Sequence, residues 1–371
     1  MKANLKEITQ YLPEGWEAEA KAKKALLRGR EIKNAEELLS LLMSYLTGSG
    51  SFMNTSVQMR LAGVNVSKTS TVWRVLSSGE WLRWLAEELS KTACGGIEKP
   101  GFLGDKNVIL VDASDELVKN RIQKEGRGKL WRLHYTFDLF NFCCKEMRLT
   151  EMTEGEKLTH YQVNADEIYI ADRIYCTIKS IEHVKQGGAD FILRFRSKSF
   201  LLYDKNGEKI EILPILSGLD TYEDVSIDCF YKNSKQELCP IRIVAMKKDE
   251  KAIKESAERM KRKWSRKQEP EALAETKEFN EYIVVATNLN YANEQVLELY
   301  RARWQIEMLF FRLKSLFGYG NAPIEKDASA KAWFYGKLFL AALCETILKR
   351  ESFSPEAEEF VKTIDRTKHT V

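Results

Sequence analysis

The segment from residue 167 to residue 196 constrains the fold more than any other part of the sequence. It consists of EIYIADR, CTIKSIEHVKQGG and ADFILRFR, a strand pattern, a helical pattern closed by two glycines, and a second strand pattern. A strand, helix and strand in succession require parallel pairing, because the helix carries the chain back to the edge where the first strand began. We therefore expect a fold of the α/β class.

Three further strand patterns precede this segment and complete the expected sheet. NVILVDAS (107–114), KLWRLHYTFDLF (129–140) and CKEMRLTEMT (144–153) are rich in β-branched and aromatic residues. Their close succession predicts an antiparallel meander. Together with the parallel pair, it predicts a mixed sheet flanked by helices.

The 371 residues are enough for two or three domains, and the local patterns suggest where these begin and end. Helical periodicity, as in AEELLSLLMSYL, continues to the glycine-rich stretch TACGGIEKPGFLGDK (92–106). Short strand patterns return after residue 197 and surround one charged stretch. We predict a helical domain at 1–100, a core in two pieces at 105–197 and 291–350, a β-rich insertion at 198–290 and a polar tail at 351–371.

Residues 56–85 have the pattern of a helix-turn-helix. A short helix is followed by a turn at Gly63, an N-cap at Ser67 and a second helix that carries Lys68 and Arg74. Polar and basic residues at the start of a second helix are typical of contact with DNA base edges. A plain three-helix packing unit would give the same pattern, so both interpretations stay open here.

The net charge of +4 is too small to indicate nucleic-acid binding by itself, so the position of the charge matters. Residues 251–270 carry eight Lys or Arg against three Glu. That stretch is either a solvated helix or a helix that follows phosphates. Arg194, in a basic group after the last core strand pattern, is a candidate for sequence-independent phosphate contact or for plain solvent exposure.

Other patterns limit the cofactors and the cellular location. Seven cysteines without a CxxC pair, and only four histidines, argue against a disulfide framework or a zinc site. A bound metal should therefore be a hard cation on carboxylates. No apolar run approaches the length of a membrane span, and the first residues lack the apolar core of a signal peptide, so we expect a cytoplasmic protein without membrane contact.

Two aspartates close strongly apolar strand patterns. Asp112 ends VILVD and Asp172 ends IYIAD. Carboxylates at strand ends of an α/β sheet occur where sites form, because a rigid strand fixes their position while the tip meets solvent. The pair is a candidate for catalysis and metal binding.

A third carboxylate lies in YRARWQIEMLFFRLKSLFGYG (300–320), which predicts one helix with a buried apolar face. At 100° per residue, four polar residues share a stripe of roughly 60° beside that face. They are Tyr300, Arg303, Glu307 and Lys314. A ladder of exposed ion pairs would produce part of this stripe, but its position at the edge of the apolar face favours a site.

These residues carry a family resemblance. Tyr300, Arg303, Glu307 and Lys314 have the spacing Y-x2-R-x3-E-x6-K, which resembles the YREK signature of bacterial insertion-sequence transposases of the DDE class. VDAS around Asp112 resembles the first motif of that family. ADRIY around Asp172 resembles the second, usually DRGY, with Ile174 in place of the glycine. The resemblance covers roughly residues 55–345.

The resemblance implies a ribonuclease H-like core with the catalytic triad Asp112, Asp172 and Glu307. It implies two Mg²⁺ or Mn²⁺ ions on the triad, a pair suited to phosphodiester chemistry because both the attacking and the leaving oxygen need neutralisation. Tyr300, Arg303 and Lys314 would contact phosphates. The expected partners are duplex DNA, as terminal inverted repeats and target, and a second protomer on the paired ends.

Three other functions compete with this one. A nuclease without strand transfer would use the same residues. A non-catalytic DNA-binding derivative should have lost a carboxylate, whereas all three candidates are present. A glycosidase-type pair of acids would leave the basic stripe and the helix-turn-helix without a role.

Overall fold

The computed structural model describes residues 5–92, 98–117, 130–267, 274–320, 322 and 327–350. Its internal contacts divide the chain into two compact units. Unit 1 comprises residues 1–99, 113–155 and 307–371, and unit 2 comprises 100–112 and 156–306. The domain boundaries drawn from sequence stay predictions, and the expected tail at 351–371 lies outside the described residues.

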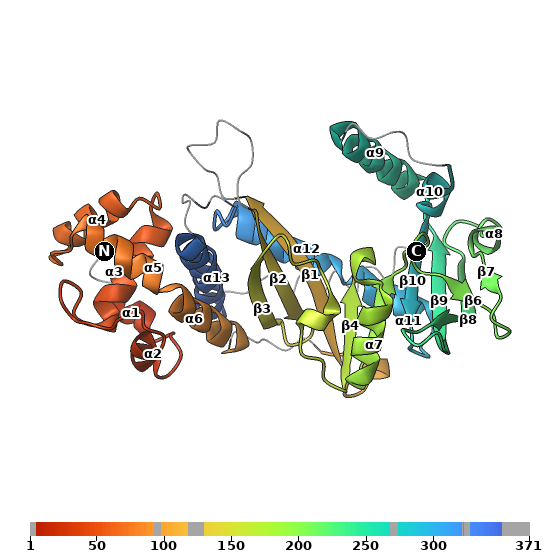
Figure 1. Cartoon of the computed structure of the whole chain (residues 1–371), viewed down its shortest axis with the longest axis horizontal. Coiled ribbons are helices and arrows are strands. Elements are labelled where there is room, and N and C mark those ends of the chain that lie inside the picture. Colours follow the sequence, from red (N-terminus) through yellow and green to blue (C-terminus); the bar gives the residue numbers. More distant parts are fainter. Residues whose placement is uncertain are drawn as a thin grey trace. The chain divides into compact units, whose positions relative to one another are not determined.

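Unit 1 begins with helices and continues with strands and the last two helices (Figure 1). Its helices are α1 (Leu5–Thr9), α2 (Trp16–Ala22), α3 (Ala35–Thr47), α4 (Phe52–Leu61), α5 (Lys68–Ser77), α6 (Gly79–Thr92), most of α12 (Trp304–Ser315), and α13 (Asp327–Arg350). Its strands are the second part of β1 (Asn107–Leu117), with β2 (Leu130–Asp138) and β3 (Cys143–Glu151).

Unit 2 alternates strands with helices and then continues with antiparallel strands. Its strands are the first part of β1, β4 (Glu167–Ala171), β5 (Asp190–Arg194), β6 (Leu202–Tyr203), β7 (Lys209–Ile210), β8 (Asp224–Lys232), β9 (Leu238–Lys247) and β10 (Tyr282–Thr287). Its helices are α7 (Ile178–Gln186), α8 (Leu213–Leu216), α9 (Glu250–Lys267), α10 (Ala274–Phe279) and α11 (Asn293–Arg301).

The ten strands found among the described residues follow the order β3-β2-β1-β4-β5-β10-β9-β8-β6-β7. β4 pairs in parallel with both β1 and β5, as the strand, helix and strand pattern requires. β2 and β3 pair antiparallel, as do β5, β10, β9 and β8 in turn. The predicted fold class, a mixed α/β sheet flanked by helices, is confirmed. The strands expected in the insertion extend this sheet beyond β5.

The core of unit 2 explains why β4 and β5 are so apolar. All five residues of β4 are buried, and Tyr169, Phe191 and Leu193 belong to one hydrophobic cluster with the inner face of α7. A strand with neighbours on both sides and covered faces has no exposed row of side chains, so its sequence does not alternate. The same burial gives the residues that follow these strands fixed positions.

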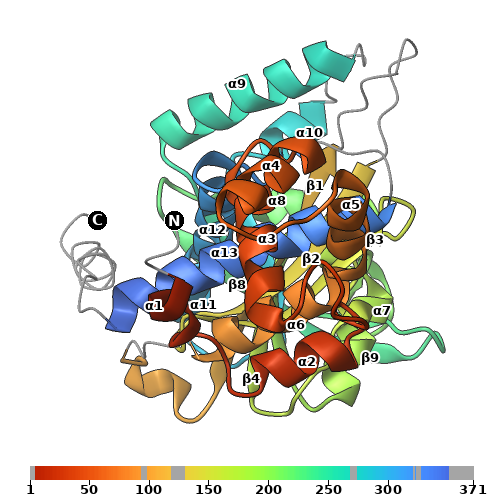
Figure 2. The ribbon, with the colours of Figure 1, turned by 90° about the vertical axis from the view of Figure 1, so that its left-hand side faces the viewer.

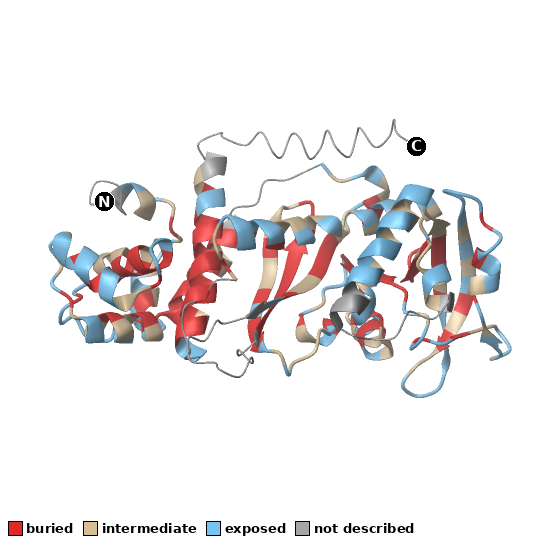
Figure 3. Cartoon of the chain, turned by 90° about the horizontal axis from the view of Figure 1, so that it is seen from above, coloured by how far each residue is buried: buried red, intermediate tan, exposed pale blue. Residues whose placement is uncertain are grey.

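In unit 1, α13 is largely buried and packs against α6 and α3 (Figure 3). Its Gly336 lies against Leu46 of α3, and the neighbouring Lys337 donates from Nζ to the Leu46 carbonyl at 2.7 Å. Tyr335 accepts from the backbone N–H of Leu149 on β3. None of the described helices is both long and apolar enough to cross a membrane.

The helix-turn-helix pattern corresponds to two helices in unit 1. Gly63 adopts a left-handed φ of 86° between α4 and α5, and the Ser67 hydroxyl caps α5 by accepting from the N–H of Ser70. The predicted turn and N-cap are therefore confirmed. Glu31 also reaches this N-terminus, where it accepts from the N–H of Ser67 at 2.7 Å. That backbone hydrogen bond lowers the pKa of Glu31.

We expect Gly336→Ala to destabilise the chain although alanine favours helices. The added methyl would lie 2.6 Å from Leu46 Cδ1, and overpacking of this kind costs about 1–3 kcal/mol against a gain in helix propensity of about 1 kcal/mol. Gly79→Ala in α6 is the matched control, because its nearest neighbouring atoms are 3.7 Å away. Urea unfolding should give a lower free energy for Gly336→Ala alone; equal values for both variants would contradict the close packing.

Candidate active site

Two aspartates follow neighbouring strands at the same point of the register. Val111 of β1 pairs with Ala171 of β4, the last pair of that parallel ladder. Asp112 and Asp172 are the next residue on each strand. Adjacent strands lie about 4.8 Å apart, so the register brings these two carboxylates to one edge of the sheet in unit 2. The roles of both aspartates in catalysis and metal binding stay predictions.

One expectation about Asp112 is wrong. β1 continues to Leu117, so Asp112 lies inside the strand and does not end it. β4 stops at Ala171, and the later part of β1 keeps only β2 as its neighbour in the sheet. With one neighbour lost at this point, the side chain of Asp112 is 19% exposed, directly after the four buried residues Val108–Val111.

Arg303 forms an ion pair with Asp112. Its Nη1 lies 3.7 Å from Asp112 Oδ2, and the two side chains are 17% and 19% exposed. An ion pair this far from bulk water is screened less than a surface pair. Arg303 therefore gives Asp112 a positive neighbour.

Tyr300 and Arg194 support this arrangement. The Tyr300 ring centre is 5.8 Å from the Arg303 guanidinium carbon and 5.9 Å from that of Arg194. Burial raises the pKa of the Tyr300 hydroxyl, and the two arginines oppose that rise. Both guanidinium groups thus lie within cation–π distance of the Tyr300 ring.

Arg194 is only 8% exposed, and its Nη2 donates to the Tyr282 carbonyl at 2.7 Å. Burial lowers the pKa of Arg194, whereas Tyr300 and Asp172 favour its charge. Little of this guanidinium is available to solvent. Its contact with DNA stays a prediction, while its contacts with Tyr300 and Tyr282 show a role in holding the site together.

The predicted single helix across residues 300–320 is wrong. α11 ends at Arg301 and α12 begins at Trp304, so Arg303 lies in the turn between them. Arg303 N–H donates to the Tyr300 carbonyl, and Ile306 N–H donates to the Arg303 carbonyl, both over three residues. A tight turn, and not a shared helix face, therefore brings Tyr300 and Arg303 together.

Glu307 and Lys314 belong to unit 1. Both are exposed on α12, two helical turns apart and so on one side of the helix. The adjoining side of the helix buries Ile306, Phe310 and Leu313, and Phe310 packs edge-on against Tyr135 at 6.1 Å. The apolar face was predicted, and it is confirmed. Among the described residues, no three Asp, Glu, His or Cys side chains gather into a metal-binding group.

The two predicted DNA contacts of the helical region differ in their surroundings. Lys68 is exposed at the first position of α5. The guanidinium of Arg74 donates to the carbonyls of Ala25 and Arg28. Burial lowers the pKa of Arg74, and Glu31 opposes that effect. Arg74 therefore fixes the segment before α3, and its contact with DNA, like that of Lys68, stays a prediction.

Sequence reasoning missed a half-buried lysine in unit 2. Lys248 follows β9 and donates to the Asn280 carbonyl and to the Ser256 hydroxyl. Burial lowers its pKa to about 8, with further contributions from Arg194 and Arg173. Nothing in the local sequence IVAMKKDE distinguishes it from an ordinary surface lysine. Arg173, directly after Asp172, was visible as part of the ADRIY motif.

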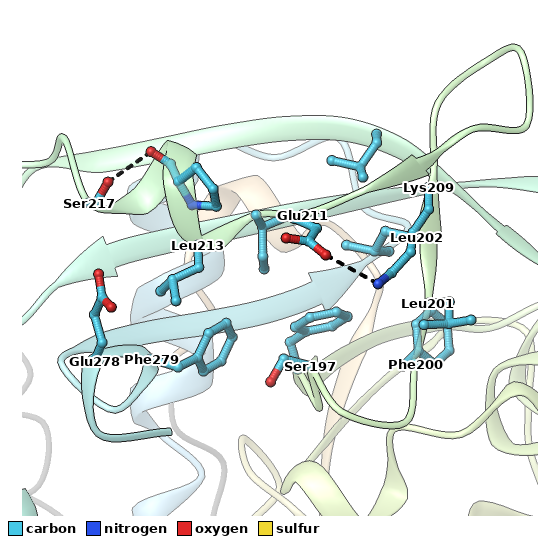
Figure 4. Close-up of a pocket in the computed structure, with 14 residues that line it drawn as sticks. Ser197, Phe200, Leu201, Leu202, Lys209, Glu211, Leu213, Ser217, Glu278 and Phe279 are labelled. Carbon is cyan, nitrogen blue, oxygen red and sulfur yellow. Dashed lines mark hydrogen bonds and ion pairs between the residues drawn. The ribbon is translucent and has the colours of Figure 1, made fainter. Parts of the chain in front are cut away.

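A separate cavity of about 340 Å³ lies in unit 2 (Figure 4). Phe195, Phe200 and Phe279 line it, and Lys209 pairs with Glu211 at 3.3 Å on its wall. Neither Asp112 nor Asp172 lines this cavity. The chemistry expected of the carboxylates therefore has its place at the sheet edge and not in the cavity.

The low pKa of Lys248 predicts a pH-dependent stability. An unfolded lysine titrates near 10.4, so between about pH 8 and 10.5 the unfolded chain holds a proton that the folded chain lacks. The contribution of Lys248 is greatest above its unfolded pKa and is lost as pH falls through its folded pKa. The free energy of unfolding should therefore rise with pH across this window.

The variant Lys248→Met should flatten that rise, and the exposed Lys205→Met is its control. Urea unfolding from pH 7 to 10.5 measures the slope for each. Parallel curves for wild type and Lys248→Met would contradict the assignment.

Comparison with known proteins identifies the family of the chain. A family model described as transposase DDE domain matches residues 70–344. InsL of insertion sequence element IS186A in Escherichia coli K12 is 29% identical over 348 residues, 91% of each chain. The transposase of IS421 from Escherichia coli is 29% identical over 349 residues, again 91% of each chain. That of IS231F from Bacillus thuringiensis subsp. israelensis is 27% identical over 200 residues, 49% of this chain and 42% of that one. The family model covers most of the chain, Asp112, Asp172 and Glu307 included, and the chain belongs to the DDE transposase family.

Proposed function

We propose that this transposase binds the terminal inverted repeats of its element, cleaves at the element ends and joins the 3′ ends to target DNA. The observation that carries the proposal is the register of β1 and β4, which aligns Asp112 with Asp172 beside Arg303. Two carboxylates and a guanidinium at one sheet edge suit a reaction that must handle an anionic phosphodiester.

The donor set fits a pair of divalent cations. Asp112 and Asp172 present oxygen ligands, which Mg²⁺ and Mn²⁺ prefer, and Asp112 already has a cationic neighbour in Arg303. Asp112, Asp172 and Glu307 would hold two such ions. When bound, the ions would neutralise charge on the attacking and leaving oxygens of the phosphodiester.

Basic residues around the carboxylates are assigned the phosphate contacts in this proposal. Arg303 would hold a phosphate next to the scissile bond through its planar fork, and Tyr300 would orient that fork by stacking. Lys314, on the same side of α12 as Glu307, would contact a neighbouring phosphate. Arg194 would contact phosphate through the part of its guanidinium that remains accessible.

DNA recognition is assigned to the helical region. Lys68, at the exposed start of α5, would reach base edges, and Arg74 would position this helix or contact the backbone. Two ends must be processed together, so a homodimer on paired ends is the proposed assembly.

Each carboxylate has a control acid close to it in the sequence. Asp172→Asn and Asp112→Asn should lower Mg²⁺-dependent cleavage of a duplex with the terminal repeat by at least about 100-fold, as should Glu307→Gln. Asp166→Asn and Asp105→Asn, at the opposite ends of β4 and β1, and Glu298→Gln on α11 should cleave like wild type. A denaturing gel with end-labelled duplex gives the rates.

The same assay separates the proposal from its alternatives. Cleaved ends without products joined to a supercoiled target plasmid would indicate a nuclease without strand transfer. Specific binding of the repeat without cleavage, unchanged in Asp172→Asn, would indicate a non-catalytic derivative. Joined products that require all three carboxylates would support the full transposase reaction.

The contact between Arg303 and Asp112 predicts that Arg303 and a bound metal ion compete for the Asp112 carboxylate. Arg303→Gln removes a cation from a ligand of the proposed ions, so it should lower the Kd for Mn²⁺ several-fold in the absence of DNA. It should also slow cleavage, because a phosphate contact is lost. Isothermal titration with Mn²⁺ measures the first effect, with the exposed neighbour Arg301→Gln as control. An unchanged or higher Kd in Arg303→Gln would contradict the competition.

A further inference from the structure

α9 is a long, strongly basic helix that takes no part in the candidate site. Glu250–Lys267 contains eight Lys or Arg and three Glu, a net charge of +5 in 18 residues. Figures 1 and 2 both show α9 as a straight helix that stands away from the strands of its unit. We propose that α9 is a second DNA-binding surface, which contacts the phosphate backbone of duplex DNA independently of sequence. This inference rests on the proposed function only in taking DNA as the partner.

The start of α9 is fixed to unit 2 by polar contacts. The Asp249 carboxylate accepts from the N–H of Ala252 at 2.6 Å and from the hydroxyl of Tyr222 at 2.6 Å. One turn later, Ser256 accepts from Asn280 Nδ2 at 2.6 Å and from Lys248 Nζ at 3.2 Å. The helix is therefore held in place by its first two turns while its outer side remains open.

The two sides of α9 have different chemistry. At about 100° per residue, the half-buried Ala252, Ile253, Ser256 and Met260 fall on one side of the helix. On the same wheel a basic stripe about 100° wide faces away from them, made of the exposed residues Lys251, Lys254, Lys261 and Arg262. The side chains of Lys254 and Arg262 are 78% and 71% exposed.

Ion pairing within the helix does not account for its charge. Each glutamate pairs with a base four residues later, as Glu250 with Lys254, Glu255 with Arg259 and Glu258 with Arg262. Such exposed pairs are weak, so a phosphate can replace the glutamate. The basic residues of α9 outnumber its acidic residues by five. Several of the basic residues are also four positions apart, and the repulsion between like charges at this spacing destabilises an isolated helix. An anionic partner would remove that repulsion.

The stripe has the dimensions of a DNA contact. From Lys251 to Arg262 the helix rises about 16 Å, at about 1.5 Å per residue. One DNA strand carries a phosphate about every 3.4 Å along the axis, so the stripe spans about five phosphates. Lysine and arginine on one helix side give charge without base-edge contacts, hence binding without sequence preference.

The test compares two triple variants of the full chain with equal loss of charge. One is Lys254→Gln/Lys261→Gln/Arg262→Gln on α9. The control is Lys179→Gln/Lys205→Gln/Lys235→Gln, three exposed lysines elsewhere in unit 2. Fluorescence anisotropy with a 30-bp duplex that lacks the terminal repeat gives Kd over a range of NaCl concentrations, and circular dichroism confirms unchanged helix content.

For the α9 variant we expect the slope of log K against log salt to become shallower by about 2–3, because each lost phosphate contact removes about 0.9. The Kd at 0.1 M NaCl should rise at least about tenfold. The control should match wild type in both quantities. Equal slopes for the α9 variant and the control would overturn the inference.

Cleavage of the terminal-repeat duplex by the same proteins separates this inference from the proposed function. Asp172-dependent cleavage together with an unchanged salt slope in the α9 variant would refute the role of α9 alone. A reduced slope without any cleavage by wild type would refute the transposition reaction alone. Failure of wild type to bind any duplex would refute both.

Discussion

The parallel ladder between β1 and β4 is the constraint on which the candidate site depends. Five consecutive residue pairs, from Asn107 with Glu167 to Val111 with Ala171, fix one strand against the other. All five residues of β4 are buried, and a slip by one residue would exchange the side chains that pack on its two covered faces. The hydrophobic core thus fixes the register of the two strands, and this register places Asp112 and Asp172 side by side, each directly after the last pair of the ladder.

The surroundings of these carboxylates are set by a second layer of interactions. Arg303 reaches Asp112 from a turn, Tyr300 lies against Arg303, and Arg194 lies against Tyr300 while it donates to β10. The chain of contacts runs from a buried strand to a partly exposed guanidinium. Cations and carboxylates so enclosed need one another, because burial without a partner would be costly for either charge.

Much of this could be predicted from sequence, because local patterns carry it. The apolar runs before Asp112 and Asp172, the parallel crossover and the cap at Ser67 all depend on neighbouring residues in the chain. The break before α12 could not be predicted, since YRARWQ contains neither glycine nor proline and its tight turn depends on tertiary packing. The continuation of β1 depends on β2, and the burial of Lys248 on Asn280 and Ser256. Those contacts lie across the sheet or far along the sequence.

The strand β4 also determines where the chain can change length during evolution. Its five residues connect the buried ladder directly to Asp172, so an inserted or deleted residue within Glu167–Ala171 would rotate or displace the carboxylate relative to Asp112. The surface turn at Asn206 and Gly207, between β6 and β7, does not position a carboxylate of the candidate site. Related chains can therefore differ freely in size at that turn, whereas the spacing from β4 to its aspartate should be constant.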